Sequence, residues 1–404
     1  MNWEKAEQKN LLHTYKRQPV VFVKGKGKYL WDVAGKKYID FFCGISVTNL
    51  GHVNPAIVKV IKSQAGKLIH CSNHYYMPEQ IKLAEALASR SFGKNNTKMF
   101  LSNSGAEANE CAIKLAFKYG TENSEIISFT DSFHGRTLAT LIATGQEKFR
   151  KGYEHVVNGF RYAEFNNIES VKKLVNNKTC AVIIEPVQGE GGINIAGKQF
   201  LMELRQLCDE HKLLLIFDEI QCGMGRTGEL FAYQYYGVEP DIITMAKSIA
   251  NGLPLGVTLV KGKYACLFNY GDHGSTFGGN IVSCAAAVKT LSLLDKKMLN
   301  KIKSLGAYFI EKLNELKLQY PKIIKESRGI GLMCAIELVV PGDPVLKKCL
   351  KKGVIINCTQ EKILRFLPPF VIEKQDIDIL INTLSGIFKN MQEKANLFDN
   401  RILG

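Results

Sequence analysis

From about residue 54 onward, short apolar segments alternate with amphipathic helices, and this alternation constrains the fold more than any other feature. Helical patterns cover residues 55–65 and 79–90. The expected strands are residues 99–101, 126–129, 181–184, 213–217, 242–244 and 256–260. Strands that alternate with helices in this way predict an α/β fold with a mostly parallel, doubly wound sheet.

The two ends of the chain follow a different pattern. Residues 20–32 alternate apolar and polar positions around Gly25 and Gly27, which predicts an antiparallel hairpin with both glycines at its turn. After residue 300 we expect a long helix, a strand region over residues 330–340 and a final helix from Lys374 to about Lys394. We therefore expect a large domain over residues 51–297. A smaller α+β domain would combine the N-terminal segment 1–50 with residues 298–404.

Composition narrows the class of protein. The 404 residues are 46% hydrophobic, which is ample for a large core. No apolar run approaches the roughly 18 residues of a membrane span, and the N-terminus has no apolar signal region, so we expect a cytosolic protein. The 11 cysteines form no Cys-x-x-Cys pair and lie mostly in apolar runs. They are interpreted as reduced core thiols, not as disulfides or metal ligands.

A net charge of +15 permits nucleic acid as a partner. However, the lysines are scattered over helical stretches such as residues 301–325, where Glu311 and Glu315 interrupt them. The pattern favours a solvated surface that attracts small anionic ligands. A nucleic-acid-binding protein stays an alternative, although the sequence offers no recognition element for it.

Ligands of open α/β sheets bind beyond the carboxyl ends of the strands, so the residues that follow each strand matter most. Residues 102–110 follow the first expected strand and open a helix, whose free N–H groups and Gly105 predict an anion site. A serine N-cap with Glu107 is the alternative. After the second strand come Phe133, His134 and Arg136, an aromatic, an imidazole and a guanidinium suited to a carboxylate; a surface turn is the alternative.

Carboxylates and a lysine follow the next strands. Glu185 and Glu190 flank a glycine-rich loop, although its glycines could simply supply positive φ angles. Asp218 ends a very apolar strand, where a carboxylate needs a cation or strong donor; an N-cap for a following helix is the alternative. Lys247 follows the strand at 242–244 and opens an irregular loop that would present its ammonium to a cleft. Asp218 and Lys247 are expected on neighbouring strands.

Together these groups match the needs of pyridoxal phosphate. A helix N-terminus holds the phosphate, an aromatic side chain covers the ring, a carboxylate keeps the pyridine nitrogen protonated, and a lysine reacts with the aldehyde. Neither metal nor nicotinamide chemistry needs this set. The sequence therefore predicts a pyridoxal-phosphate enzyme.

The chain resembles the class III pyridoxal-phosphate aminotransferases, which have fold type I, and most closely the acetylornithine aminotransferases among them. The resemblance runs from about residue 27 to 380 and rests on motifs at residues 104–110, 132–137, 185–192, 217–221, 223–228, 246–247, 273–280 and 364–369. It implies a cytosolic homodimer with shared active sites. It also implies transfer of the terminal amino group of N2-acetyl-L-ornithine to 2-oxoglutarate, a step of arginine biosynthesis.

The resemblance assigns roles around the cofactor. Lys247 is similar to the Schiff-base lysine, Asp218 to the partner of the pyridine nitrogen and Phe133 to the aromatic that stacks on the ring. Gln221 would contact the ring hydroxyl, and Thr276 would reach the phosphate of the partner subunit's site. The remaining cofactor contacts implied by the matching motifs are Ser104, Gly105, Ala106, Glu219 and Ile220.

It also assigns roles toward substrates. Arg136 resembles the arginine that binds the α-carboxylate of acetylornithine, with Ser275 close by. Arg365 resembles the arginine that binds the α-carboxylate of 2-oxoglutarate, and Glu190 resembles the glutamate that masks it. Ile45 stands where ornithine aminotransferases carry a tyrosine for the free α-amine, and an apolar residue suits an acylated donor.

His134 stands where the ornithine enzymes tend to have tryptophan, which also favours acetylornithine. Ornithine and N-succinyl-diaminopimelate remain alternative donors. An aminomutase or decarboxylase on the same scaffold also stays open, although it should not need two carboxylate-binding arginines. The chain departs from the family at Ala250 and Asn251, where the loop after the lysine often has glycines.

Overall fold

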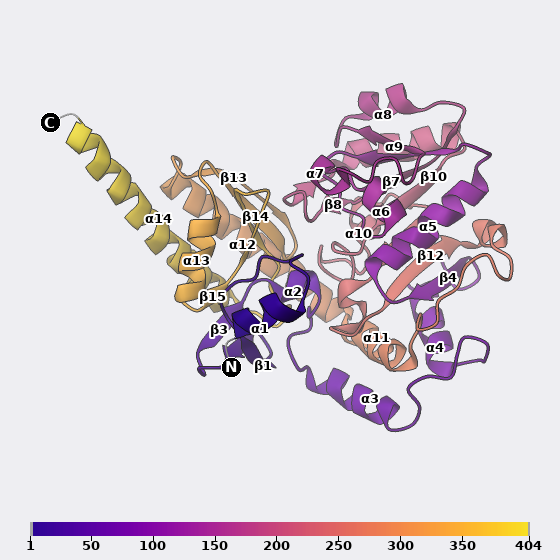
Figure 1. The fold of residues 1–404 in the computed structure, drawn as a ribbon, viewed down its shortest axis with the longest axis horizontal. Coiled ribbons are helices and arrows are strands. Elements are labelled where there is room, and N and C mark those ends of the chain that lie inside the picture. The colour runs from indigo at the N-terminus through magenta and orange to yellow at the C-terminus, as the bar shows by residue number, and fades with distance from the viewer. Residues whose placement is uncertain (1–2, 403–404) are drawn as a thin grey trace.

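The computed structural model describes residues 3–402, with side chains described as far as residue 393. Its centre is a seven-stranded sheet in which only β12 runs antiparallel to its neighbours (Figure 1). In sheet order the strands are β4 (Thr97–Ser102), β12 (Gly256–Lys261), β11 (Ile242–Met245), β10 (Leu214–Asp218), β7 (Thr179–Ile184), β5 (Glu125–Phe129) and β6 (Phe160–Ala163). The predicted mostly parallel sheet is confirmed, and β6 was not predicted.

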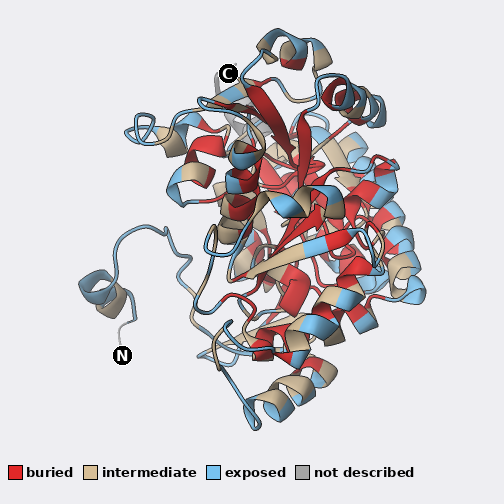
Figure 2. Cartoon of the chain, turned by 90° about the vertical axis from the view of Figure 1, so that its right-hand side faces the viewer, coloured by how far each residue is buried: buried red, intermediate tan, exposed pale blue. Residues whose placement is uncertain are grey.

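Both faces of this sheet are covered, which explains why its strands are apolar throughout. In β10, Leu214 and Ile216 pack under α5 (Gly105–Tyr119) and α6 (Leu138–Ala143). Leu215 and Phe217 point to the other face, which is covered by α8 (Ile168–Leu174) and α9 (Lys198–Glu210). Successive strand residues point to opposite faces, so a doubly covered strand shows no alternation. Buried residues accordingly gather along the strands (Figure 2).

The remaining helices of this region are short and surround the sheet. The predicted helix at 55–65 is α3 (Pro55–Ala65), which begins at Pro55 because Asn54 Oδ1 accepts from Ala56 N and Ile57 N. The one predicted at 79–90 is α4 (Pro78–Ala88). The others are α7 (Glu147–Arg150), α10 (Ala232–Tyr236), α11 (Ile281–Leu293) and the 3₁₀ turns η1 (Lys247–Ala250) and η2 (Gly262–Leu267). A small ribbon pairs β8 (Val187–Gln188) with β9 (Asn194–Ile195).

A second region joins the two ends of the chain (Figure 1). One sheet has the order β1 (Phe22–Lys26), β2 (Tyr29–Asp32), β3 (Lys37–Asp40) and β15 (Val354–Ile355). The predicted hairpin is β1 and β2, but only Gly27 lies at its turn, because Gly25 pairs with Leu30 inside the ladder. The other sheet is antiparallel, with the order β13 (Ile324–Ile330), β14 (Met333–Leu338), β17 (Ile363–Phe366) and β16 (Asn357–Thr359).

Helices α12 (Lys296–Gln319) and α13 (Asp343–Lys351) pack on these sheets. Helix α14 (Lys374–Ile402) packs on α12 and α13 and extends beyond the rest of the molecule in Figure 1. The N-terminal helix α1 (Trp3–Asn10) has no buried residue. The predicted strand region at 330–340 corresponds to β14. With β15 from the C-terminal part paired to β3, we propose the domain limits 1–50, 51–297 and 298–404.

Two predictions from composition can be compared with the structure. All 11 cysteines are free and eight of them are buried, and their interpretation as reduced core thiols stays a prediction. Across residues 3–402, none of the helices combines the length and the apolar character that a membrane crossing requires.

Candidate active site

A cavity of about 420 Å³ lies at the carboxyl ends of the parallel strands. Each strand that was expected to be followed by reactive side chains contributes to its lining. The lining includes Ser104, Gly105 and Ala106 after β4, Phe133, His134 and Arg136 after β5, Glu185 and Glu190 after β7, Asp218, Ile220 and Gln221 at and after β10, and Lys247 after β11. The strand-end argument therefore identified the position of this cavity.

Lys247 is the first residue of η1 and has a left-handed φ of 46°. A residue with a side chain adopts this conformation only under constraint from its surroundings. Burial lowers the pKa of the Lys247 ammonium, while the nearby carboxylates of Glu190, Asp218 and Glu185 act in the opposite direction. A lowered lysine pKa enlarges the neutral, nucleophilic fraction of the amine.

Asp218 lies on the strand next to that of Lys247, in register with Thr244 of β11. The carboxylate is buried and accepts from His134 Nδ1 and Asn109 Nδ2, each at 2.7 Å from Oδ2. Its Oδ1 accepts from Ile220 N at 3.0 Å. The alternative role as a helix N-cap is wrong, because the next helix, α10, begins only at Ala232.

His134 and Asn109 form a layer behind Asp218 that extends its hydrogen bonds into the core. Asn109 Nδ2 also donates to the His134 carbonyl oxygen at 2.8 Å. His134 is almost completely buried, and within the described part of the chain its Nε2 and Asn109 Oδ1 have no hydrogen-bond partner. Buried donors of this kind fix a carboxylate in one orientation.

Glu185 follows the last residue of β7 and lies fully buried beside this layer. Its oxygens accept from Phe133 N at 2.9 Å and Gly189 N at 3.1 Å. Burial, followed by the charge of Asp218, raises the pKa of Glu185. The alternative that the loop glycines supply positive φ angles is wrong for Gly189, which has no positive φ. Glycine is needed there because a Cβ would collide with Gln221 Oε1.

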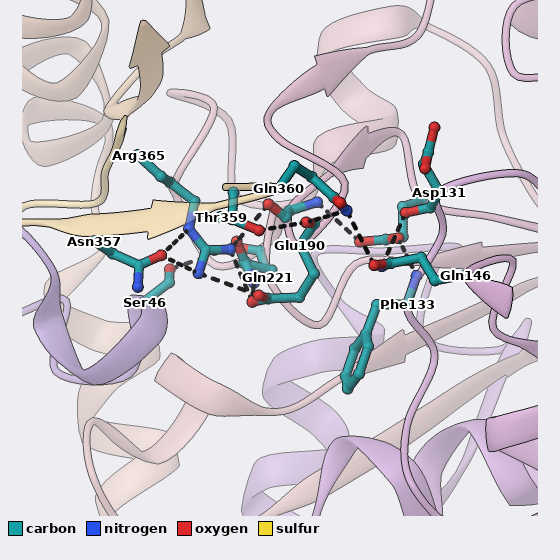
Figure 3. A network of polar contacts seen from close by, with 12 residues as sticks. Ser46, Asp131, Phe133, Gln146, Glu190, Gln221, Asn357, Thr359, Gln360 and Arg365 are labelled. Carbon is teal, nitrogen blue, oxygen red and sulfur yellow. Dashed lines mark hydrogen bonds and ion pairs between the residues drawn. The ribbon is translucent and has the colours of Figure 1, made fainter. Parts of the chain in front are cut away.

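Arg365, on β17, is buried and faces Glu190 (Figure 3). Its Nη1 donates to Glu190 Oε1 at 2.8 Å and to Gln221 Oε1 at 3.1 Å, and Nη2 donates to Asn357 Oδ1 at 2.8 Å. Burial by itself would raise the pKa of Glu190, but the charge and hydrogen bonds of Arg365 outweigh it and lower this pKa to about 2. The guanidinium is thus covered by a carboxylate that remains ionised.

Arg136 and the start of α5 border other parts of the cavity. The exposed Arg136 guanidinium lies 3.8 Å from the ring centroid of Phe149 and 5.3 Å from that of Phe133, an orientation set by cation–π contact. Ser104 Oγ accepts from Glu107 N at 3.2 Å, so the N-cap role of Ser104 is confirmed. Gly105 and Ala106 are the first residues of the helix, where backbone N–H groups precede the helical hydrogen-bond pattern.

The structure does not bring every predicted residue to this cavity. Val47, and not Ile45, is in its lining. Glu219 points away: its carboxylate accepts from Ala232 N and Tyr233 N, and burial raises its pKa to about 8. Ser275 Oγ accepts from Asn103 Nδ2 at 3.0 Å outside the lining, and Thr276 is exposed.

The segment that carries Val47 begins with a left-handed turn, α2 (Cys43–Ser46), in which all four residues have positive φ angles between 53° and 67°. Left-handed conformations are unfavourable by roughly 1–2 kcal/mol for each residue other than glycine. The buried Arg226 offsets this strain, because its guanidinium donates to Ser46 Oγ and Asn49 Oδ1. It also donates to the carbonyl oxygens of Leu332 at 3.0 Å and Pro368 at 2.7 Å.

Comparison with known proteins places this arrangement in a family. The family described as Aminotransferase class-III matches residues 12–388. The chain belongs to the class-III aminotransferases. Acetylornithine aminotransferase of Methanocaldococcus jannaschii is 49% identical to this class-III aminotransferase over 97% of the chain and 99% of that protein. The enzyme of the same name from Aquifex aeolicus is 46% identical over 93% and 99%.

Solved structures agree with this aminotransferase in fold. The ornithine aminotransferase of Toxoplasma gondii matches with a TM-score of 0.92 and 29% identity over 97% of this chain and 96% of that one. The acetylornithine aminotransferase of Elizabethkingia anophelis matches with a TM-score of 0.85 and 29% identity over 96% and 98%. The predicted fold class and family are confirmed.

Sequence reasoning missed several residues of the site, among them Asn109 and Val47. Asn109 lies in the fifth position of α5, where an apolar face would ordinarily hold an alanine or leucine, and a buried asparagine there is the signal that could have identified it. Val47 carries no such signal, because its position depends on the left-handed turn before it.

Proposed function

We propose that this class-III aminotransferase uses pyridoxal 5′-phosphate to transfer the terminal amino group of N2-acetyl-L-ornithine to 2-oxoglutarate. The products are N-acetyl-L-glutamate 5-semialdehyde and L-glutamate, as in arginine biosynthesis. One observation carries the cofactor assignment: Lys247 follows β11, the buried Asp218 ends the adjacent strand β10, and both line one cavity with the N-terminus of α5. The donor assignment follows the acetylornithine aminotransferases that are 42–49% identical over nearly the whole chain.

The residues present fit pyridoxal phosphate. Asp218 has its carboxylate fixed by two buried donors and suits a protonated ring nitrogen. Ser104, Gly105 and Ala106 begin a helix of 15 residues, where backbone N–H groups and the helix dipole favour a phosphate. Phe133 supplies an aromatic face in the same cavity.

When bound, the cofactor supplies an electrophilic carbon for the amine and a ring that withdraws electrons from the reacting carbon. Lys247 Nζ would hold the cofactor through its aldehyde carbon, and the lowered pKa favours the neutral amine that this bond requires. Once the donor's amine has displaced it from that carbon, the freed Lys247 amine would be placed to move a proton from the donor carbon. The Asp218 carboxylate would accept a hydrogen bond from the protonated ring nitrogen. His134 and Asn109 keep that carboxylate in one orientation.

Two arginines near one cavity suit two acidic substrates. Arg136 is exposed at the cavity and free to bind the α-carboxylate of the donor. Arg365 would bind the α-carboxylate of 2-oxoglutarate or glutamate once Glu190 moves aside. The ion pair between Glu190 and Arg365 therefore keeps a second carboxylate site closed while acetylornithine is bound.

We place the donor's acylated amine against the apolar wall that Val47 forms, and Ile45, outside this lining, packs on buried apolar residues. An apolar wall suits an amide nitrogen better than the cationic α-amine of ornithine. N-succinyl-diaminopimelate, another acylated donor, is the second candidate. We also infer that the enzyme is a cytosolic homodimer in which Thr276 and Ser275 serve the partner subunit's cavity, which would explain why they lie outside this one.

A comparison of donors tests the proposal. With protein saturated with pyridoxal phosphate, kcat/KM is measured with 2-oxoglutarate as acceptor for acetylornithine, ornithine and N-succinyl-diaminopimelate. We expect kcat/KM for acetylornithine to exceed that for ornithine at least about tenfold, the discrimination that one buried charge commonly produces. An equal or higher kcat/KM for ornithine would show that acetylornithine is not the preferred donor.

A further inference from the structure

The loop that follows Lys247 is bonded to the left-handed segment through one side chain. Asn251 ends η1 in the left-handed conformation, with φ 46° and ψ 47°. Its Oδ1 accepts from Leu50 N at 2.8 Å, and its Nδ2 donates to Gly51 O at 3.3 Å. Glycine would adopt the same backbone conformation without these two hydrogen bonds.

The segment that Asn251 holds is under strain and is fixed at its other end. Residues 43–46 form the left-handed turn, and Arg226 donates to Ser46 and Asn49. Leu50 and Gly51 are buried. If Asn251 no longer accepted from Leu50 N, this N–H would therefore be left without a partner and out of reach of solvent. Arg226 and Asn251 thus clamp residues 46–51 from two sides.

This clamp connects two walls of the cavity. Val47 comes from the clamped segment, whereas Gly252 and Leu253 come from the loop after Lys247, and all three line the cavity. The side chain of Thr48 lies 3.6 Å from the position that a Cβ on Gly252 would occupy. Loss of the hydrogen bond between Asn251 Oδ1 and Leu50 N would let these two walls move apart.

We propose that Asn251 is a positioning residue that fixes Val47 and its neighbours against the Lys247 loop and so sets the shape of the donor site. The inference rests on the proposed function. Asparagine, like glycine, can adopt the left-handed backbone at position 251. In addition, its side chain makes two hydrogen bonds that glycine would lack.

The test uses Asn251→Gly, which keeps the left-handed backbone accessible but removes both hydrogen bonds. Asn251→Asp retains the acceptor for Leu50 N and should rescue part of the effect. Asn123→Gly is the matched control, because Asn123 is also left-handed but lies in an exposed turn before β5, at the edge of the sheet opposite the cavity.

Amide exchange in the cofactor-free protein gives the first readout. We expect the Leu50 amide to exchange about tenfold or more faster in Asn251→Gly, with partial recovery in Asn251→Asp and no change in Asn123→Gly. The second readout is kinetic: KM for acetylornithine should rise roughly five- to tenfold in Asn251→Gly while kcat changes less than about threefold.

Unchanged exchange at Leu50 would overturn the proposal, as would faster exchange with an unchanged KM. If wild-type protein fails to turn over acetylornithine, the proposed donor falls, and the KM comparison is made with glutamate as the amino donor. The exchange result does not depend on the donor and still decides whether Asn251 holds the segment.

Discussion

His134 Nδ1 donates to Asp218 Oδ2 over 2.7 Å, with both side chains removed from solvent. The imidazole is therefore a buried hydrogen-bond partner of the carboxylate, and His134 also lines the cavity. The resemblance drew attention to His134 through donor choice, whereas the structure connects it to the charge of Asp218. A hydrogen bond between a buried carboxylate and a ring N–H is among the stronger kinds in proteins.

Replacement of His134 should remove one of the hydrogen bonds that orient the Asp218 carboxylate. Hydrogen bonds to charged groups contribute about 1.5–3 kcal/mol, so we expect His134→Ala to lower kcat/KM roughly 10- to 100-fold. Titration of cofactor-free protein with pyridoxal phosphate should show weaker binding as well. His134→Gln, which can still donate a hydrogen bond, should lose less; equal activity of His134→Ala and wild type would reject this role.

The ion pair between Glu190 and Arg365 should affect the half-reaction with glutamate more than the half-reaction with acetylornithine. In Glu190→Gln the guanidinium loses its ionised partner, so the α-carboxylate of glutamate no longer competes with a neighbouring charge. We expect kcat/KM for glutamate to rise relative to that for acetylornithine by about tenfold. Single-turnover measurements of each half-reaction would check this, and an unchanged ratio would show that the ion pair does not control access.

The same pair makes stability depend on pH. The folded state lowers the pKa of Glu190 from 4.5 to about 2, so its contribution is present above pH 4.5 and is lost as the pH falls toward 2. Between pH 6 and pH 3.5, wild type should lose roughly 1 kcal/mol more of its free energy of unfolding than Glu190→Gln, since one pH unit below the unfolded pKa corresponds to about 1.4 kcal/mol. Urea unfolding of both cofactor-free proteins at the two pH values measures the difference.

Arg226 should be the most sensitive arginine for stability. Arg226→Met removes the guanidinium that donates to Ser46 Oγ and Asn49 Oδ1, and it leaves the buried carbonyl groups of Leu332 and Pro368 without this donor. Because each unsatisfied buried group is unfavourable by about 1–3 kcal/mol, we expect a loss of roughly 3 kcal/mol or more in urea unfolding. Arg161→Met, at the exposed pair with Glu125, serves as the control and should unfold at nearly the wild-type urea concentration.

Predictions from the sequence succeeded where one physical rule connected pattern and position. Strands buried on both faces are apolar throughout, and their carboxyl ends meet at one edge, so the sequence pattern alone was enough to place Asp218 and Lys247 together. Strand β6 was missed because it lies at the sheet edge, and β13 was missed because its middle residues are charged and partly exposed.

Other parts of the site depend on contacts between distant segments, which local pattern does not encode. Asn109 meets Asp218 across 109 positions of the chain. Val47 reaches the cavity only because a strained turn is fixed by Arg226, a residue far along the sequence. Thr276 and Ser275 were assigned by resemblance, and they lie outside the lining of this cavity.

The most direct test follows the absorbance of purified protein loaded with pyridoxal phosphate. Addition of acetylornithine without 2-oxoglutarate should abolish the absorption band of the Lys247-bound cofactor, and later addition of 2-oxoglutarate should restore it. Borohydride reduction before either addition should leave the cofactor on the peptide that contains Lys247. A band that acetylornithine leaves unchanged would contradict the donor, and a reduced cofactor found on another lysine would contradict the site.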